Sequence, residues 1–189
     1  MTGLLLGDLC IHRQKTAVNV RLQFCQGIVH KDYLLHLYDL FEIYCNTGPK
    51  TTNRSPDIRT GKTYNTIGFQ TLALPCFKEL YDLFYSSGVK TVPVNFKELL
   101  TPLALAYWIG DDGGFCKTSQ RLTLATHSFT LKDIELLSEI LDEKFNLKCA
   151  VHKNNKSHVI RVPAKSLSVL QELLASHMPT TMRHKIGLS

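Results

Sequence analysis

The chain repeats one pattern of segments, and this repeat constrains its fold more than any other feature of the sequence. A short apolar segment that ends in an acid occurs at residues 2–8 and again at 103–112, with the closing acids Asp8 and Asp112 about 104 residues apart. Each copy precedes a stretch of alternating polar and apolar residues, VNVRLQF around Arg21 and QRLTLAT around Arg121, which is typical of a half-buried strand. The sequence therefore predicts two similar halves, and 189 residues suffice for one compact domain or two small ones.

The other elements follow in the same order in both halves. Apolar residues at helical spacing predict helices over 31–44 and 131–145, and Thr130 with Asp133 predicts a capping box at the start of the second. Further strands are expected near 63–74, 148–152 and 158–162, and closing helices over 77–86 and 165–177. The predicted fold class is α+β, with αββαββα halves at 1–87 and 102–189 and a linker at 88–101 that contains Gly88 and Pro93.

The two opening helices combine small residues with a terminal acid. Gly3 and Gly7 lie four residues apart in the first helix, as do Ala106 and Gly110 in the second, so the two backbones can approach closely. An acid at a helix C-terminus opposes the helix dipole, and a divalent cation would offset that cost. If the helices pair in parallel, their terminal carboxylates meet and form a site for a hard cation. The alternative is that these acids are ordinary polar turn residues.

Charge and cysteine content narrow the functional classes. The net charge of +6 indicates a polyanionic partner, and the segment 46–62, which we expect to be a long loop, holds +3 of it. The apolar runs are too short to span a membrane, and no secretory signal or transit peptide opens the chain, so we expect a soluble protein that, if organellar, is made in the organelle. Six cysteines without a C-x-x-C pair argue against zinc or a disulfide scaffold, and we expect reduced thiols, mostly in the core.

Longer motifs identify a family. The segments MTGLLLGDL at 1–9, LTPLALAYWIGDDGG at 100–114 and LATHSFTLKDIELLSEIL at 124–141, with the ending MPTTMRHKIG, resemble single-chain LAGLIDADG homing endonucleases with two motifs. They are similar to fungal mitochondrial intron-encoded members, the group of the yeast omega intron endonuclease. Two departures are the start of the first motif at Met1, which fits either a trimmed chain or a minimal version, and Leu9 in place of a closing glycine.

The resemblance implies a fold and a chemistry. The fold would contain two saddle-shaped antiparallel sheets that lie in the DNA major groove, around the central helix pair. Asp8 and Asp112 would bind catalytic Mg²⁺, for which Mn²⁺ is an acceptable substitute, with further ligands from the carbonyls of Gly7 and Asp111. Lys90, before Thr91-Val92-Pro93, and Lys185 match the lysines that such enzymes place near each cleavage site, although a solvated surface role is the alternative for each.

Recognition would come from outward strand positions and basic loops. Arg, Gln and Asn suit base edges in the major groove, and Lys and Arg in loops suit phosphates, whereas a solvated sheet face is the competing interpretation. Gln23 and Gln70 are also candidates for polar residues near the metals. The candidate DNA-binding residues are Arg13, Lys15, Asn19, Arg21, Gln23, Lys50, Arg54, Arg59, Lys62, Thr66, Gln70, Arg121, Thr123, His152, Lys153, Lys156 and Arg161.

Three functions remain compatible with these features. The first is a monomeric, Mg²⁺-dependent endonuclease that cuts a long asymmetric DNA site, leaves short 3′ overhangs and promotes intron mobility in a mitochondrion or chloroplast. The second is a maturase whose partner is intron RNA, and the third is a non-cleaving DNA-binding relative. The presence of Asp8, Asp112, Lys90 and Lys185 favours cleavage, because binding alone needs no divalent-metal site.

Overall fold

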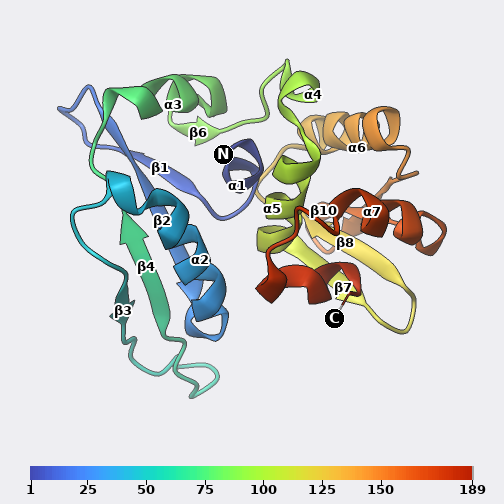
Figure 1. Cartoon of the computed structure of the whole chain (residues 1–189), viewed down its shortest axis with the longest axis horizontal. Helices are drawn as coiled ribbons and strands as arrows, with labels where there is room; N and C mark the ends of the chain where they lie inside the picture. Colours follow the sequence, from blue (N-terminus) through green and yellow to red (C-terminus); the bar gives the residue numbers. More distant parts are fainter. Residues whose placement is uncertain (189) are drawn as a thin grey trace. The chain divides into compact units, whose positions relative to one another are not determined.

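The computed structural model describes residues 1–188 and contains the predicted element order twice (Figure 1). The first series consists of α1 (Thr2–Leu6), β1 (Cys10–Arg13), β2 (Val20–Gly27), α2 (Lys31–Phe41), β3 (Lys50–Thr52), β4 (Thr66–Gln70) and α3 (Lys78–Phe84). The second consists of α5 (Pro102–Asp112), β7 (Gly113–Cys116), β8 (Arg121–Ala125), α6 (Leu131–Phe145), β9 (Ala150–Asn154), β10 (Ser157–Val162) and α7 (Leu167–Leu174). The α+β class and the αββαββα order are therefore confirmed.

Two compact units divide the chain, and each is described by itself. One unit, which we call the 8–83 unit, runs from Asp8 to Leu83. The other, which we call the helix-pair unit, joins residues 1–7 to the chain from Phe84 onward. Helix α1 belongs to the helix-pair unit because it packs against α5. The sequence boundaries at 87 and 102 describe the repeat and stay a prediction.

The 8–83 unit is a four-stranded antiparallel sheet in the order β1-β2-β4-β3, with α2 on one face. Alternation in β2 turns Val20, Leu22 and Phe24 into the core. The ring of Phe24 stacks on that of Phe69 at 4.4 Å, and Tyr38 of α2 meets Phe69 edge-on at 5.2 Å. This aromatic cluster fixes the inner face of the sheet, so the other face is left for polar side chains.

The helix-pair unit contains a second four-stranded antiparallel sheet in the matching order β7-β8-β10-β9, with α6 packed against β9 and β10. The predicted capping box of α6 is present, since the Thr130 side chain accepts from the Asp133 backbone N–H and Asp133 reaches back to Thr130. Asn146 ends the helix in the left-handed conformation. The helix occupies Leu131–Phe145, as the apolar spacing predicts.

Helices α1 and α5 pack side by side and in parallel, as the small-residue spacing predicts (Figure 1). Gly3 lies against the backbone of Ala104, and Gly7 lies against the side chain of Asp111, so both helices advance in the same direction. A Cβ on Gly3 would overlap the Ala104 carbonyl oxygen. Only glycine permits this approach, and Leu105 and Trp108 are completely buried around it.

The segment predicted as a linker is folded within the helix-pair unit. A small antiparallel hairpin pairs β5 (Tyr85–Ser86) with β6 (Val89–Lys90), and α4 (Phe96–Leu99) follows. Phe96 and Leu100 have no exposed surface. The predicted closing helix at 77–86 accordingly ends early, at Phe84, where the chain enters this hairpin.

Two expectations are wrong. The cysteines are free, as predicted, but they are not mostly in the core: Cys10, Cys25, Cys76 and Cys116 are exposed and the other two are half-buried. Cys10, Cys25 and Cys116 occupy outward strand positions, where the alternation of the sheet decides burial rather than the hydrophobicity of the thiol. The segment 46–62 is also not entirely loop, because β3 forms at Lys50–Thr52. Within residues 1–188 no helix combines the length and apolar character needed to cross a membrane.

Candidate functional site

Two lysines make equivalent contacts at the ends of the paired helices. Lys90 Nζ donates a hydrogen bond of 2.9 Å to the carbonyl oxygen of Gly7, and Lys185 Nζ donates one of 2.9 Å to the carbonyl oxygen of Asp111. Each acceptor is the residue directly before the closing acid of its motif, Asp8 or Asp112. The lysines chosen from the sequence therefore occupy matching places in the repeat.

Different elements deliver these two ammonium groups. Lys90 lies in β6, opposite Tyr85 of β5. Lys185 lies in the 3₁₀ segment Thr180–Ile186, which packs against α5 and β7. Gln171 of α7 fixes that segment by donating a 2.8 Å hydrogen bond to the carbonyl of Ile186. Both lysines are half-buried, which strengthens the interaction of their charges with neighbouring oxygens.

The closing acids have distinct surroundings. Asp8 is exposed, and its Oδ2 accepts a 2.8 Å hydrogen bond from Gln26 Nε2 at the end of β2. Asp112 is half-buried at the last position of α5. The side chain of Asp111 lies against Gly7, so its carboxylate packs on α1 while its backbone carbonyl faces Lys185.

Gln26 is the residue that sequence reasoning missed. Gln23 and Gln70 were the candidates for polar residues near the metals, but they lie directly opposite each other across β2 and β4, and Gln70 Oε1 accepts from Arg21 at 3.4 Å. Strand alternation places Gln26 on the inner face of β2, with Leu22 and Phe24, and therefore gives no reason to expect it near Asp8. The available signal was a glutamine just before Gly27, where the strand ends and its inner face is no longer covered.

The oxygen atoms at these helix ends fit a hard divalent cation. Carboxylates and backbone carbonyls are the ligands that Mg²⁺ prefers, and the carbonyls of Gly7 and Asp111 already attract an ammonium group each. Among residues 1–188 no three His, Cys, Asp or Glu side chains gather into a metal cage. The donor set thus suits Mg²⁺ held by few protein ligands, with substrate phosphates and water completing its shell. Metal binding here is a prediction.

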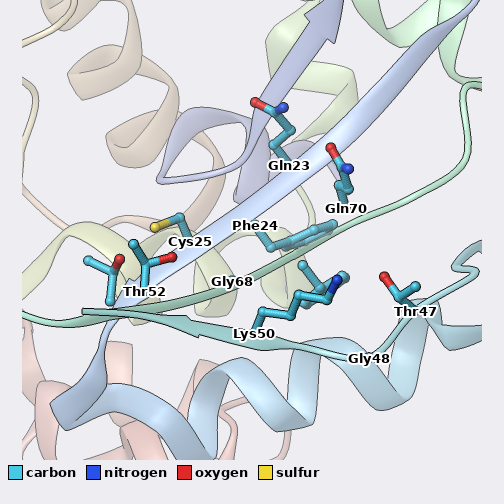
Figure 2. A pocket seen from close by; sticks show the side chains of 11 residues that line it. Gln23, Phe24, Cys25, Thr47, Gly48, Lys50, Thr52, Gly68 and Gln70 are labelled. Carbon is cyan, nitrogen blue, oxygen red and sulfur yellow. The ribbon is translucent and has the colours of Figure 1, made fainter. Parts of the chain in front are cut away.

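The outward face of the 8–83 sheet carries the predicted polar residues. In register, His12 lies opposite Arg21, Cys10 opposite Gln23, and Gln23 opposite Gln70. Figure 2 shows Gln23, Cys25, Gln70 and Lys50 around a hollow of about 340 Å³ on this face. Thr52 and Thr66 continue the row toward the β3–β4 loop. Asn19 comes just before β2 and is half-buried.

The outward face of the second sheet carries fewer of the predicted polar residues than that of the 8–83 sheet. Thr123 lies opposite Arg161, and Arg161 lies opposite Ala150. Arg121 pairs with Cys116 at the end of the sheet, and His152 pairs with Val159. The pKa of the exposed Cys116 thiol is lowered, mainly by hydrogen bonds from Ser119. Burial, followed by the Asp142 carboxylate, raises the pKa of Cys149 to about 12.

The predicted phosphate-binding cations lie at hairpin ends. Arg13 Nε donates a 3.1 Å hydrogen bond to the Ala17 carbonyl, and the Arg13 guanidinium lies 5.9 Å from the centre of the Tyr81 ring. Both contacts stabilise the β1–β2 hairpin, which also contains Lys15. Lys153 lies near the end of β9, next to the two-residue turn Asn155-Lys156 that connects β9 to β10. Arg54, Arg59 and Lys62 lie in the β3–β4 loop. The roles of all these residues stay predictions.

Comparison with known proteins shows one family. The model of the LAGLIDADG DNA endonuclease family matches residues 1–170. The cytochrome b mRNA maturase bI2 of Debaryomyces hansenii is 35% identical over 99% of this chain, which spans 72% of that protein. The protein of the same name in Saccharomyces cerevisiae is 32% identical over 98% of this chain, which spans 46% of it. The solved structure of the homing endonuclease I-WcaI bound to its DNA recognition sequence is 27% identical, with a TM-score of 0.92 over 100% of this chain and 84% of that one.

Proposed function

Because the chain belongs to the LAGLIDADG DNA endonuclease family, we propose that it is a homing endonuclease that cuts both strands of a long, asymmetric DNA site. The reaction would be Mg²⁺-dependent phosphodiester hydrolysis that leaves short 3′ overhangs and promotes the mobility of an intron. We further propose that the protein acts in a mitochondrion or chloroplast, since its relatives include proteins named intron-encoded endonucleases. We propose a monomer because one chain contains both motifs.

The observation that carries this proposal is the matched pair of lysine contacts. Each motif ends in an acid, and each acid is preceded by a carbonyl that accepts from a half-buried ammonium group at 2.9 Å. A protein that only bound nucleic acid would need neither the acids nor a repeated arrangement of cations around them. Two copies of one arrangement suit an enzyme that cuts two strands.

The residues of this chain then have separate roles. Asp8 and Asp112, with the carbonyls of Gly7 and Asp111, would hold Mg²⁺, which supplies a water of lowered pKa and a Lewis acid for the phosphate. Lys90 and Lys185 place positive charge where negative charge grows on the phosphate in the transition state. Gln26 fixes the orientation of the Asp8 carboxylate through Nε2.

The outward sheet faces would bind the duplex. Arg21, Gln23 and Gln70 on one sheet, and Arg121, Thr123 and Arg161 on the other, offer the donors and acceptors that suit base edges in a major groove. The hairpin cations would contact phosphates, which makes the affinity salt-dependent. The DNA-bound state of I-WcaI supports this proposal.

A second candidate function is assistance to splicing of an intron RNA. The two relatives at 35% and 32% identity are both named mRNA maturases, which favours it as the alternative. The same basic surfaces could bind RNA, but splicing assistance would place no demand on the acids or on the two lysines.

Cleavage of organellar DNA that lacks introns separates these functions. Purified wild-type protein is incubated with a library of such DNA, with Mg²⁺, with Mn²⁺ or with EDTA, and the cut ends are sequenced. We expect cuts at one site with either metal and none in EDTA. In parallel, splicing of a group I intron transcript is followed with and without the protein. Absence of any cut with metal, together with accelerated splicing, would reject the endonuclease in favour of the maturase.

A further inference from the structure

The β3–β4 loop, residues 53–65, has an apolar tip among cations. Ile58 is fully exposed, with a relative accessibility of 105%. Arg59 follows it, and Arg54 and Lys62 lie on the two arms of the loop, against the single acid Asp57. One exposed apolar side chain is ordinary on a protein surface. An isoleucine at the tip of a cationic loop is different, because the cations draw the loop to a polyanion and carry the apolar tip with them.

The loop is held in a defined shape by its two most buried side chains. Asp57 Oδ1 accepts from the backbone N–H groups of Arg59 at 3.0 Å and Thr60 at 2.8 Å. Asn65 Oδ1 accepts from the N–H of Arg54 at 3.1 Å and so ties the arms together. Apart from these half-buried acceptors, Asp57 and Asn65, every side chain of the loop is exposed.

Backbone contacts complete the hairpin. The N–H of Asp57 donates to the carbonyl of Lys62 at 2.9 Å, and the N–H of Gly61 donates to the carbonyl of Asp57 at 2.7 Å. Gly61 has a φ of +66°, in the left-handed region that glycine enters without strain. Ile58 therefore projects from an ordered turn, and little conformational entropy is lost when it meets a partner.

The length of the loop matches the spacing of DNA grooves. Ile58 lies six positions after Thr52, the last residue of β3, and six residue steps span at most about 20–22 Å. Half a helical turn of B-DNA, the step from a major groove to the next minor groove, is about 17 Å. Figure 1 shows the loop continuing beyond the ends of β3 and β4, away from the sheet.

We propose that the β3–β4 loop enters the minor groove beside the major groove occupied by the 8–83 sheet, with Ile58 as an apolar wedge against the base steps. The loop cations would contact the phosphates on the groove walls. Apolar side chains that enter a minor groove partly unstack a step and favour easily deformed sequences. The loop would thus read deformability at base pairs that the sheet does not touch. This inference rests on the proposed DNA binding.

Footprinting tests the wedge independently of cleavage. A duplex is selected from a random pool by binding to the wild-type protein in EDTA, and hydroxyl radicals then report protection of the minor groove. We expect a protected stretch about five base pairs beyond the sheet contacts. Ile58→Ser should lose that protection and bind about tenfold more weakly. The matched control is Val94→Ser, an exposed apolar residue of the helix-pair unit (95%), which should change neither.

A pair of Asp57 variants tests the ordered turn. Asp57→Asn removes the charge but keeps an oxygen acceptor for the two N–H groups, so it should bind at least as tightly as wild type. Asp57→Ala removes the same charge and also the acceptor, and it should bind about fivefold more weakly than Asp57→Asn because the tip loses its order. Equal affinities for the two variants would contradict a pre-formed wedge.

The outcomes are separable from those of the proposed function. An Ile58→Ser protein with the wild-type footprint and affinity overturns the wedge, even if the wild type cuts DNA as proposed. A wild-type protein that selects no duplex overturns the wedge and the proposed DNA binding together.

Discussion

The two halves of the repeat agree at the ends of their motif helices and differ at the rims of their sheets. At the end of each motif helix a lysine donates to the carbonyl before the closing acid, with the same 2.9 Å distance, although one lysine comes from strand β6 in the 88–101 segment and the other from a 3₁₀ segment. The sheets share one strand order. Yet the β3–β4 loop has thirteen residues (53–65), whereas the β9–β10 turn has two (155–156). Under the proposed function, the contacts at the helix ends would serve the chemistry common to both strands, and the loops of unequal length would serve recognition of an asymmetric site.

A second difference lies beside the acids. Gln26 donates to Asp8 in the first half, and the residue that corresponds to it when Arg21 is aligned with Arg121 is Thr126, directly after β8. Thr126 is completely buried and donates a 2.8 Å hydrogen bond to the carbonyl of His158. It serves the sheet rather than a carboxylate. If each motif serves one strand, as proposed, loss of the Gln26 contact should affect only the strand served by Asp8.

The largest effect should follow loss of either lysine. Lys90→Met and Lys185→Met each keep the length of the side chain but remove its charge, so cleavage should fall about 100-fold or more. The rate of each strand is measured with separately labelled strands on denaturing gels. Lys165→Met, which removes an exposed charge on the same unit, is the control and should cut at the wild-type rate. Cleavage by either lysine variant at the rate of this control would contradict the proposal that Lys90 and Lys185 have equivalent roles.

The helix pair should be intolerant of a single methyl group. Gly3→Ala would press its Cβ into the Ala104 backbone and lower the free energy of unfolding by about 2–3 kcal/mol, measured by urea denaturation. Gly114→Ala is the matched control, because its Cβ would find its nearest neighbour at 3.9 Å and should change stability by less than about 0.5 kcal/mol. Equal stabilities for the two variants would mean that α1 and α5 are not in close contact.

The Gln26 contact should matter for one strand only. Gln26→Ala should slow cleavage of the strand served by Asp8 about tenfold, since the carboxylate loses its orientation, and leave the other strand nearly unchanged. Gln14→Ala, in the exposed β1–β2 loop, is the control for loss of a carboxamide. Equal slowing of both strands would contradict the asymmetry between the halves.

The smallest effect is expected at Thr126. Thr126→Val keeps the shape of the side chain but leaves the His158 carbonyl without this donor, so the free energy of unfolding should fall by about 1 kcal/mol. Thermal or urea unfolding measures this change, and the ratio of the two strand rates should stay as in wild type. A changed ratio would show that Thr126 acts on catalysis.

Much of this architecture was predictable because repetition and periodicity are local signals. The apolar spacing predicted the bounds of α6, and the small residues of the two motifs predicted that α1 and α5 pack together. The strand β3 could not be recognised from the sequence because Lys50, Thr51 and Thr52 are all polar and all exposed, so they show no alternation. Its position is set by pairing with β4, which is a tertiary property.

The site was less predictable than the fold. Lys90 and Lys185 could be chosen only because the family resemblance pointed to them, and their contacts depend on segments far away in the sequence. The cysteines were misplaced because strand alternation turns them outward, whereas Gln26 was missed because alternation turns it inward with Leu22 and Phe24. The layer that covers this inner face ends beside Asp8, at the last residues of β2.

The most direct test of the central claim is cleavage by Asp8→Asn and Asp112→Asn on the duplex that the wild-type protein cuts. Each variant keeps the size of the side chain and removes the charge that would hold Mg²⁺. We predict that neither variant cuts the duplex, while both bind it with an affinity within a few-fold of wild type in EDTA. Cleavage at the wild-type rate by either variant would contradict the account.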